Sequence, residues 1–313
     1  FAASTVGGAL SATATTGNIT DSGALAITGT STFTVANGQS VILDESSTFS
    51  TVTFASAGTI ASIEVNDSNA LDLGTLTTTG NLTVTAGGNI TDSGTVTVGG
   101  NLIATTDANS GAIDLGTLAV DGTMALVTHN NGAATVVNDA AIEFAASTVG
   151  GALSATATTG NMTQSGALDI EGTTTLVTAA QGATIVLGTT TNAFTSAVTI
   201  TTNDNDSPTD GTYAAHVTID GGTTALVIAA STIDGNLTLT SGHASGITDS
   251  GTVTVGGNLA ATTDDNDGVI DMGTLRVDGT VALTTDGSGD ATVVNDAGIN
   301  FASSTVRGNL SAT

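Results

Sequence analysis

The sequence predicts an all-β fold, a right-handed parallel β-solenoid (β-helix) with about three short strands in each coil of 20–22 residues. Three observations predict it: a long internal repeat, a shorter period marked by glycine, and an alternation of apolar residues inside each short period. No stretch shows a sustained helical pattern of apolar residues, so we expect no helix.

The long repeat covers nearly the whole chain. Residues 1–18 recur unchanged at 144–161. Residues 90–156 match residues 247–313 at a constant offset of 157, with 50 of 67 positions identical and no gap.

These matches set the expected domain organisation. The chain divides into long repeat units 1–143 and 144–300, and residues 301–313 begin a third. We expect residues 1–313 to form a single continuous solenoid segment, part of a longer chain or filament.

The short period begins with a glycine, followed by a small or polar residue and then alternating apolar residues. It returns mostly every 20–22 residues, at Gly80, Gly100, Gly122, Gly151, Gly172, Gly235, Gly257 and Gly279. In the period that starts at Gly100, the runs 101–105, 112–115 and 117–120 alternate with the two-residue period of a strand. They place one set of apolar side chains on a single face: Leu102, Ala104, Ile113, Leu115, Leu118 and Val120.

Strands this short cannot bury their apolar faces alone. Stacking the coils about 4.8 Å apart pairs each strand with its counterpart and creates a continuous interior. Small apolar residues suit a narrow core, and we expect buried phenylalanines to fill its wider corners, at Phe33, Phe49, Phe54, Phe144 and Phe194. The alternative fold is a tandem of two β-sandwiches, which would not need the short period.

The charge of the chain excludes several functions. It carries 28 acidic residues against two basic ones, Arg276 and Arg307, for a net charge of −26. Nucleic acids and anionic lipids both require basic surfaces, so we expect neither as a partner. No apolar run approaches the roughly 20 residues of a membrane span, so we expect no direct membrane insertion. The absence of cysteine excludes disulfides and thiolate metal sites.

The segment 80–102, GNLTVTAGGNITDSGTVTVGGNL, resembles the coils of filamentous-haemagglutinin-type surface adhesins and of the giant β-strand-repeat surface proteins of bacteria. This resemblance implies an extracellular or cell-surface fibre that mediates attachment or matrix formation. The motif FAASTV of residues 1–6 returns as FASSTV at 301–306. We therefore expect the chain to associate with itself, head-to-tail or laterally, and its further partner to be a host or neighbouring cell surface.

Two acidic runs are the candidate metal sites. The first supplies Asp204, Asp206 and Asp210, and the second supplies Asp264, Asp265 and Asp267. Carboxylate and amide oxygens on a loop are ligands that Ca²⁺ prefers, so calcium is the one cofactor that we expect. The spacing does not match an EF-hand, and the alternative is a solvated surface loop. Residues 107–111, the counterpart of the second run, lack two of its three carboxylates.

Asparagines recur at the predicted turns, at Asn18, Asn81, Asn101, Asn161, Asn236 and Asn258. We expect turn residues that repeat because the coil repeats. The alternative is a hydrogen-bonded ladder of stacked side chains.

No catalytic constellation is visible. His129, His216 and His243 lie far apart without metal-ligand spacing, and there is no Gly-x-Ser-x-Gly elbow. One tyrosine and no tryptophan leave little for stacking on sugars. We expect a structural protein and not an enzyme, namely an extracellular fibre or adhesin stalk. The alternatives are a calcium-dependent, carbohydrate-binding or ice-binding module, the last from Thr-x-Thr pairs such as Thr83-Val-Thr85, and a solenoid polysaccharide hydrolase.

Overall fold

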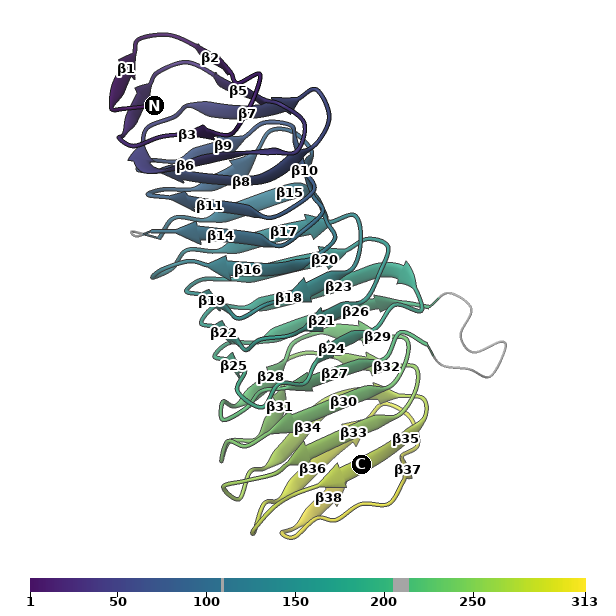
Figure 1. Ribbon diagram of the computed structural model, residues 1–313. Helices are drawn as coiled ribbons and strands as arrows, with labels where there is room; N and C mark the ends of the chain where they lie inside the picture. Colours follow the sequence, from purple (N-terminus) through teal and green to yellow (C-terminus); the bar gives the residue numbers. More distant parts are fainter. Residues whose placement is uncertain (108–109, 205–213) are drawn as a thin grey trace. The chain divides into compact units, whose positions relative to one another are not determined.

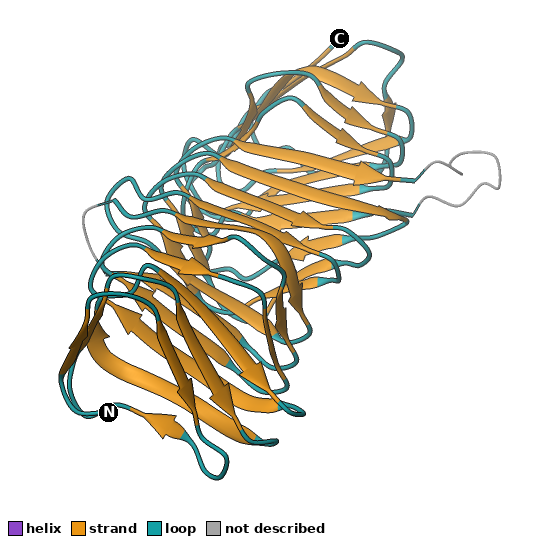
Figure 2. Cartoon of the chain, turned by 90° about the horizontal axis from the view of Figure 1, so that it is seen from above, coloured by secondary structure: helices purple, strands orange, loops and turns teal. Residues whose placement is uncertain are grey.

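The computed structural model describes residues 1–107, 110–204 and 214–313. These residues form strands, turns and loops, with no helix among them, as Figure 2 shows. The strands are parallel and stack in about 14 coils, about 21 residues apart. The fold is therefore the predicted β-solenoid, and the β-sandwich alternative is wrong. Within the described ranges, no helix could cross a membrane.

The chain forms two compact units, Phe1–Ala152 and Leu153–Thr313. The boundary lies close to the end of the first long repeat at residue 143. The single continuous solenoid over residues 1–313 remains a prediction.

The strands of the first unit follow one another through successive coils (Figure 1). They are β1 (Ser4–Val6), β2 (Leu10–Thr13), β3 (Ile19–Thr20), β4 (Leu25–Ile27), β5 (Ser31–Val35), β6 (Gln39–Ser47), β7 (Thr51–Ser56), β8 (Ile60–Asp67), β9 (Leu71–Leu73), β10 (Leu76–Thr78), β11 (Leu82–Ala86), β12 (Ile90–Asp92), β13 (Val96–Val98), β14 (Leu102–Thr106), β15 (Ile113–Val120), β16 (Thr123–Val127), β17 (Ala134–Asn138), β18 (Ile142–Phe144) and β19 (Ser147–Val149).

The strands of the second unit repeat this arrangement. They are β20 (Leu153–Ala157), β21 (Met162–Gln164), β22 (Leu168–Ile170), β23 (Thr174–Gln181), β24 (Ile185–Leu187), β25 (Ala193–Phe194), β26 (Val198–Asn203), β27 (Val217–Asp220), β28 (Leu226–Ile228), β29 (Ser231–Ile233), β30 (Leu237–Ser241), β31 (Ile247–Asp249), β32 (Val253–Val255), β33 (Leu259–Thr263), β34 (Ile270–Val277), β35 (Thr280–Thr284), β36 (Ala291–Asn295), β37 (Asn300–Phe301) and β38 (Leu310–Ala312).

Apart from β1 and β4, which pair with each other, the strands fall into two parallel ladders, which we call ladders I and II. In ladder I, β12 pairs with β9 and β15, with Ile90 opposite Ile113. In ladder II, β11 pairs with β8 and β14, with Leu82 opposite Leu102. Apolar residues of successive coils therefore stand over one another inside the solenoid.

The predicted interior is confirmed. The six apolar residues expected on one face of the period that begins at Gly100 are all at most 2% exposed. They lie on β14 and β15, because the second and third predicted runs join into one strand. The five phenylalanines expected in the core are buried as well.

Several coils are straight in one ladder and bent in the other. The straight side is a strand such as β14, and the bent side is a pair of three-residue strands such as β12 and β13. In β15 the two short strands join, and its halves pair separately with β12 and β13. The bend lies in ladder I at β12 and β13 but in ladder II at β18 and β19. In the second unit it returns from ladder II to ladder I between β25 and β28.

Candidate functional site

The polar side chains at the turns connect one coil to the next. All six predicted turn asparagines accept a hydrogen bond at Oδ1 from a backbone N–H of the following coil, at 2.8–2.9 Å. Asn81 accepts from Asn101, and Asn101 accepts from Thr123. The residues are therefore turn residues, as expected, and they also form a ladder whose rungs join side chain to backbone.

Glycine precedes most of these asparagines for a steric reason. A Cβ at Gly100, which precedes Asn101, would collide with Oδ1 of Asn81 and with the carbonyl of Gly80. Gly257, which precedes Asn258, has the same relation to Asn236 and Gly235. The Gly-Asn signature thus reflects close packing of one turn on the next, which only a residue without a side chain allows.

An aspartate holds each of the eight-residue strands β15 and β34 at its bend. The carboxylate of Asp92 accepts hydrogen bonds from the backbone N–H groups of Gly116 (3.0 Å) and Thr117 (2.8 Å). At the equivalent position of the second unit, Asp249 accepts from Gly273 (2.9 Å) and Thr274 (2.7 Å). Each carboxylate also accepts from the hydroxyl of the same threonine.

At the corners of some coils, a buried asparagine side chain forms the hydrogen bonds that a backbone peptide group would otherwise form. Asn138 is fully buried, and its side chain accepts from the N–H of Val120 (2.8 Å) and donates to the carbonyl of Val120 (3.0 Å). Asn295 makes the same two contacts with Val277. A side-chain amide carries one donor and one acceptor group like a peptide unit, so it completes a rung where the strand ends.

A serine in the repeated Ser-Thr-apolar motif closes the bent side of a coil. Ser147 Oγ accepts from the N–H of Leu126 (3.1 Å) and donates to the carbonyl of Ala145 (3.0 Å). Ser231 does the same between Ile200 (2.9 Å) and Ala229 (2.8 Å). The motif therefore marks a connection between coils.

Of the first acidic run, Asp206 and Asp210 lie outside the described residues, and Asp204 lies inside them. Asp204 is 8% exposed. Its Oδ2 accepts from the N–H of Ala214 (3.0 Å), and its own N–H donates to Asp234 (2.7 Å). Asp204 thus ties together the two ends of the segment that contains the other two carboxylates.

The residues of the second acidic run are exposed, and their side chains lie at two different places. Asp264 and Asp265 line a polar hollow of about 230 Å³, together with Asp220. Asp267 points elsewhere and accepts from the N–H of Ser288 (2.6 Å). Burial raises the pKa of Asp220, the N–H of Gly222 opposes the rise, and the nearby Asp264 carboxylate adds to it. Asp220 was not among the predicted ligands, because the sequence pattern around it predicts only the end of a strand.

Among the residues that the structure describes, no three His, Cys, Asp or Glu side chains form a group that could hold a metal ion. Calcium binding by the six predicted aspartates remains a prediction. Two histidines serve as backbone acceptors: His216 Nδ1 accepts from Asn236 N–H (3.0 Å) and His243 Nδ1 from Ser245 N–H (2.9 Å). His216 thus takes the place of an asparagine in the turn ladder.

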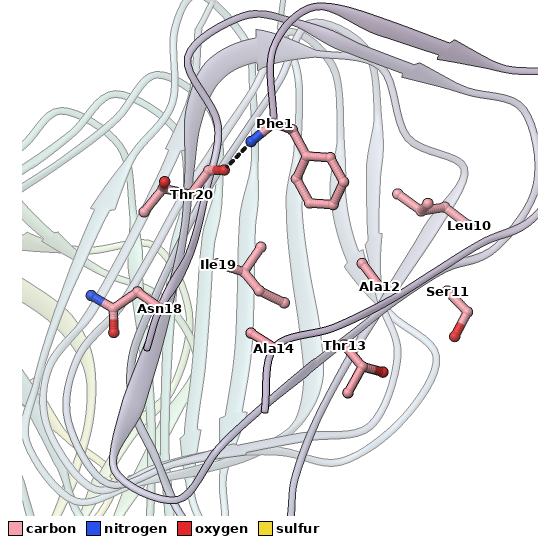
Figure 3. Close-up of a pocket in the computed structure, with 9 residues that line it drawn as sticks. All are labelled: Phe1, Leu10, Ser11, Ala12, Thr13, Ala14, Asn18, Ile19 and Thr20. Atoms are coloured by element: carbon pink, nitrogen blue, oxygen red, sulfur yellow. Dashed lines mark hydrogen bonds between the residues drawn. The ribbon is translucent and has the colours of Figure 1, made fainter. Parts of the chain in front are cut away.

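A hollow of about 480 Å³ lies in the first coil. Figure 3 shows Phe1, Leu10 and Ile19 around it. In the second long repeat, the positions equivalent to Leu10 and Ile19 are Leu153 and Met162, and both are buried. The lining of the hollow offers hydrogen-bonding side chains only at Ser11, Thr13, Asn18 and Thr20.

Comparison with known proteins places this architecture in a family. The model of a family described as repeats of unknown function (DUF5649) matches residues 1–56, 57–129, 131–201 and 214–270. The chain belongs to this family of repeats. No curated protein and no solved structure matches it. The four consecutive DUF5649 matches agree with the internal repetition of the sequence and with the stacked coils.

Proposed function

We propose that this DUF5649 chain is a structural segment of an extracellular fibre or adhesin stalk, which carries mechanical load in surface attachment or matrix formation. The observation that supports the proposal most is that polar side chains at the turns and bends are engaged in hydrogen bonds between coils. Three of these side chains form hydrogen bonds to another coil, namely those of Asn101, Asp92 and Asn138. Such an arrangement holds coils together and leaves these groups unavailable for a substrate.

The ladders support a mechanical role. Every backbone bond of a ladder joins neighbouring coils, so a force along the stack is shared by many parallel hydrogen bonds. The turn asparagines add further bonds between the same coils. The net charge of −26 keeps neighbouring chains apart in solution.

Self-association is part of this proposal. Within the chain, coils of the same repeat associate by parallel strand pairing and apolar contact, as β11 does with β14, and we extend this mode of contact to neighbouring chains. Divalent cations bridging the acidic surfaces would assist lateral contacts between chains.

Localisation and attachment are tested in the organism that produces the protein. Antibodies against the 313-residue chain should label structures on the surface of intact cells in electron microscopy. Deletion of the gene should reduce attachment to surfaces, and complementation should restore it. Label confined to the cell interior would contradict the proposal.

The mechanical role is tested by pulling single chains between their ends. We expect Asn101→Ala to lower the force at which the first unit unfolds, because it removes the bond to Thr123 N–H. Loss of this bond corresponds to about 1 kcal/mol. The matched control is Asn131→Ala, at an exposed asparagine of the same unit. Equal unfolding forces for the two variants would count against a load carried by the asparagine ladder.

A further inference from the structure

Several asparagines lie in the sequence Asn-x-Ser/Thr, which is the acceptor signature for N-linked sugars. Within the part of the chain that the structure describes, the signature occurs at Asn18, Asn66, Asn81, Asn89, Asn161, Asn236 and Asn309. Four of these side chains are exposed, lie directly before a strand and accept a hydrogen bond from the next coil. We call them the turn acceptors: Asn18, Asn81, Asn89 and Asn161.

The start of a strand brings both groups of the signature to the surface. Asn81 is exposed, Leu82 is fully buried, and Thr83 is half-buried on the outer side of β11. Successive side chains of a strand point to opposite faces, so the amide of Asn81 and the hydroxyl of Thr83 point outward together. The apolar residue between them fills the core. A transferring enzyme would therefore meet both groups on one accessible face.

The fold uses only the oxygen of each turn acceptor. Each Oδ1 accepts from a backbone N–H of the following coil at 2.9 Å, in turn that of Ser40, Asn101, Ala112 and Thr184. In the described ranges, no hydrogen bond is donated by Nδ2 of a turn acceptor. A sugar on Nδ2 replaces one hydrogen and leaves the carbonyl in place, so the bond to the next coil survives the modification.

Two other asparagines with the signature use the nitrogen as well. Asn66 Nδ2 donates to the carbonyl of Asp44 (3.2 Å), and Asn309 Nδ2 donates to Asp290 Oδ1 (3.2 Å). A sugar on either nitrogen would compete with a contact that the fold already makes. Asn236 has the Oδ1 bond of the turn acceptors but is half-buried. The fold thus separates the turn acceptors from the other asparagines that share their sequence signature.

We propose that the turn acceptors are sites of N-linked glycosylation. The substrate is a sugar that is joined through C1 to a diphosphate, and a glycosyltransferase of the producing cell catalyses the transfer. The bond between Nδ2 and C1 forms, the C1–O bond breaks, and the diphosphate leaves with the electron pair. The proton from Nδ2 passes to a base of the enzyme. The inference goes beyond the proposed function, because the backbone ladders form a fibre with or without sugars.

The test is glycopeptide mass spectrometry of the protein purified from the organism that produces it. We expect sugar on the peptides that contain the turn acceptors and none on those that contain Asn66 or Asn309. The added mass identifies the donor: a single sugar indicates a nucleoside diphosphate sugar, and a preassembled oligosaccharide indicates a lipid-linked one. A protein without sugar at all four turn acceptors would overturn the proposal, whether or not the cells that lack the gene attach less well.

The first variant separates the signature from the hydrogen bond. Thr83→Val removes the hydroxyl but keeps Asn81 and its bond to Asn101 N–H. We expect the sugar at Asn81 to be lost, while Asn89 in the same chain keeps its sugar and serves as the internal standard. Sugar retained at Asn81 in this variant would contradict the assignment.

The second variant creates an acceptor at a matched turn. Asn101 is exposed and has the same Oδ1 bond, to Thr123 N–H, but Leu102 and Ile103 follow it and supply no hydroxyl. Ile103 is 40% exposed, so the surface accommodates a threonine there. We expect Ile103→Thr to gain sugar at Asn101, which the wild type lacks. Absence of the gain, with the wild-type sites modified, would show that the turn geometry is not what the enzyme accepts.

Discussion

At the scale of single residues, two of the interior hydroxyls that the structure describes have no hydrogen-bond partner. Ser31 and Thr174 occupy equivalent positions of the two long repeats and are both fully buried. The hydroxyl of each lacks a hydrogen bond. Thr174 stands between Leu153 and Val198 in the ladder, so its surroundings are apolar. A buried polar group without a partner costs about 1–3 kcal/mol.

Replacing Thr174 by valine should therefore stabilise the protein. The side chain keeps its shape and loses only the unpaired hydroxyl. We expect Thr174→Val to increase the free energy of unfolding by about 1 kcal/mol. Urea denaturation measures this as a higher midpoint at an unchanged slope.

The matched substitution is Thr263→Val in the same unit. Thr263 is as deeply buried, but its hydroxyl donates to the carbonyl of Gly268 (2.7 Å) and closes the turn. This variant should lower the free energy of unfolding by about 1 kcal/mol. The explanation fails if Thr174→Val destabilises the protein as much as Thr263→Val.

At the scale of elements, the bend of β34 depends on a side chain from another coil. Asp249 ends β31 and accepts from both backbone N–H groups at the bend, those of Gly273 and Thr274. The register of β34 with β36 shifts at this place, so regular pairing is interrupted there. The Asp249 carboxylate therefore supplies the hydrogen-bond acceptors that the neighbouring strand does not provide at the bend.

Asp249→Ala should accordingly destabilise the protein by about 2 kcal/mol, since hydrogen bonds to a charged group are stronger than neutral ones. The control is Asp271→Ala, which removes an exposed carboxylate from β34 itself. Chemical denaturation should separate the two variants. A loss of similar size in both would show that the bend does not need Asp249.

At the scale of the whole molecule, the many carboxyl groups make stability depend on pH and on salt. Three aspartates, Asp21, Asp67 and Asp220, have a pKa raised above the ordinary value of 3.8, in each case chiefly by burial. For such a group the folded state binds the proton more tightly than the unfolded chain. Its contribution is fully present below 3.8 and is lost as pH rises through the raised values.

The melting temperature should therefore rise when the pH falls from 7 toward 4. Added salt at neutral pH should also raise it, because screening over about 8–10 Å weakens the repulsion among the 26 excess negative charges. Calorimetry across pH and salt checks both trends. A melting temperature that falls on acidification, or that is unchanged from low to molar salt, would contradict this account.

Much of the fold could be predicted from local pattern. Alternation in Leu102–Thr106 and in Ile113–Val120 identifies both the strands and their buried faces, because a strand turns every second side chain inward. The Gly-Asn signature located the turns. The candidate site was predicted less well. The sequence pointed to Asp264 and Asp265, whereas Asp220, which lines the same hollow, had no signal of its own.

The sequence by itself determined the strand content, the coil length and the interior residues, since each follows from a periodicity that neighbouring residues reveal. Only the tertiary structure decided which ladder is bent and which polar groups meet. The position of the bend and the polar contacts depend on the register between coils of unequal length. Leu82 lies opposite Leu102, whereas Ile185 lies opposite Val217. A partner 20 residues away in one coil and 32 in another has no fixed spacing in sequence, so the contacts of Asp92 and Asn138 are decided by how the coils stack.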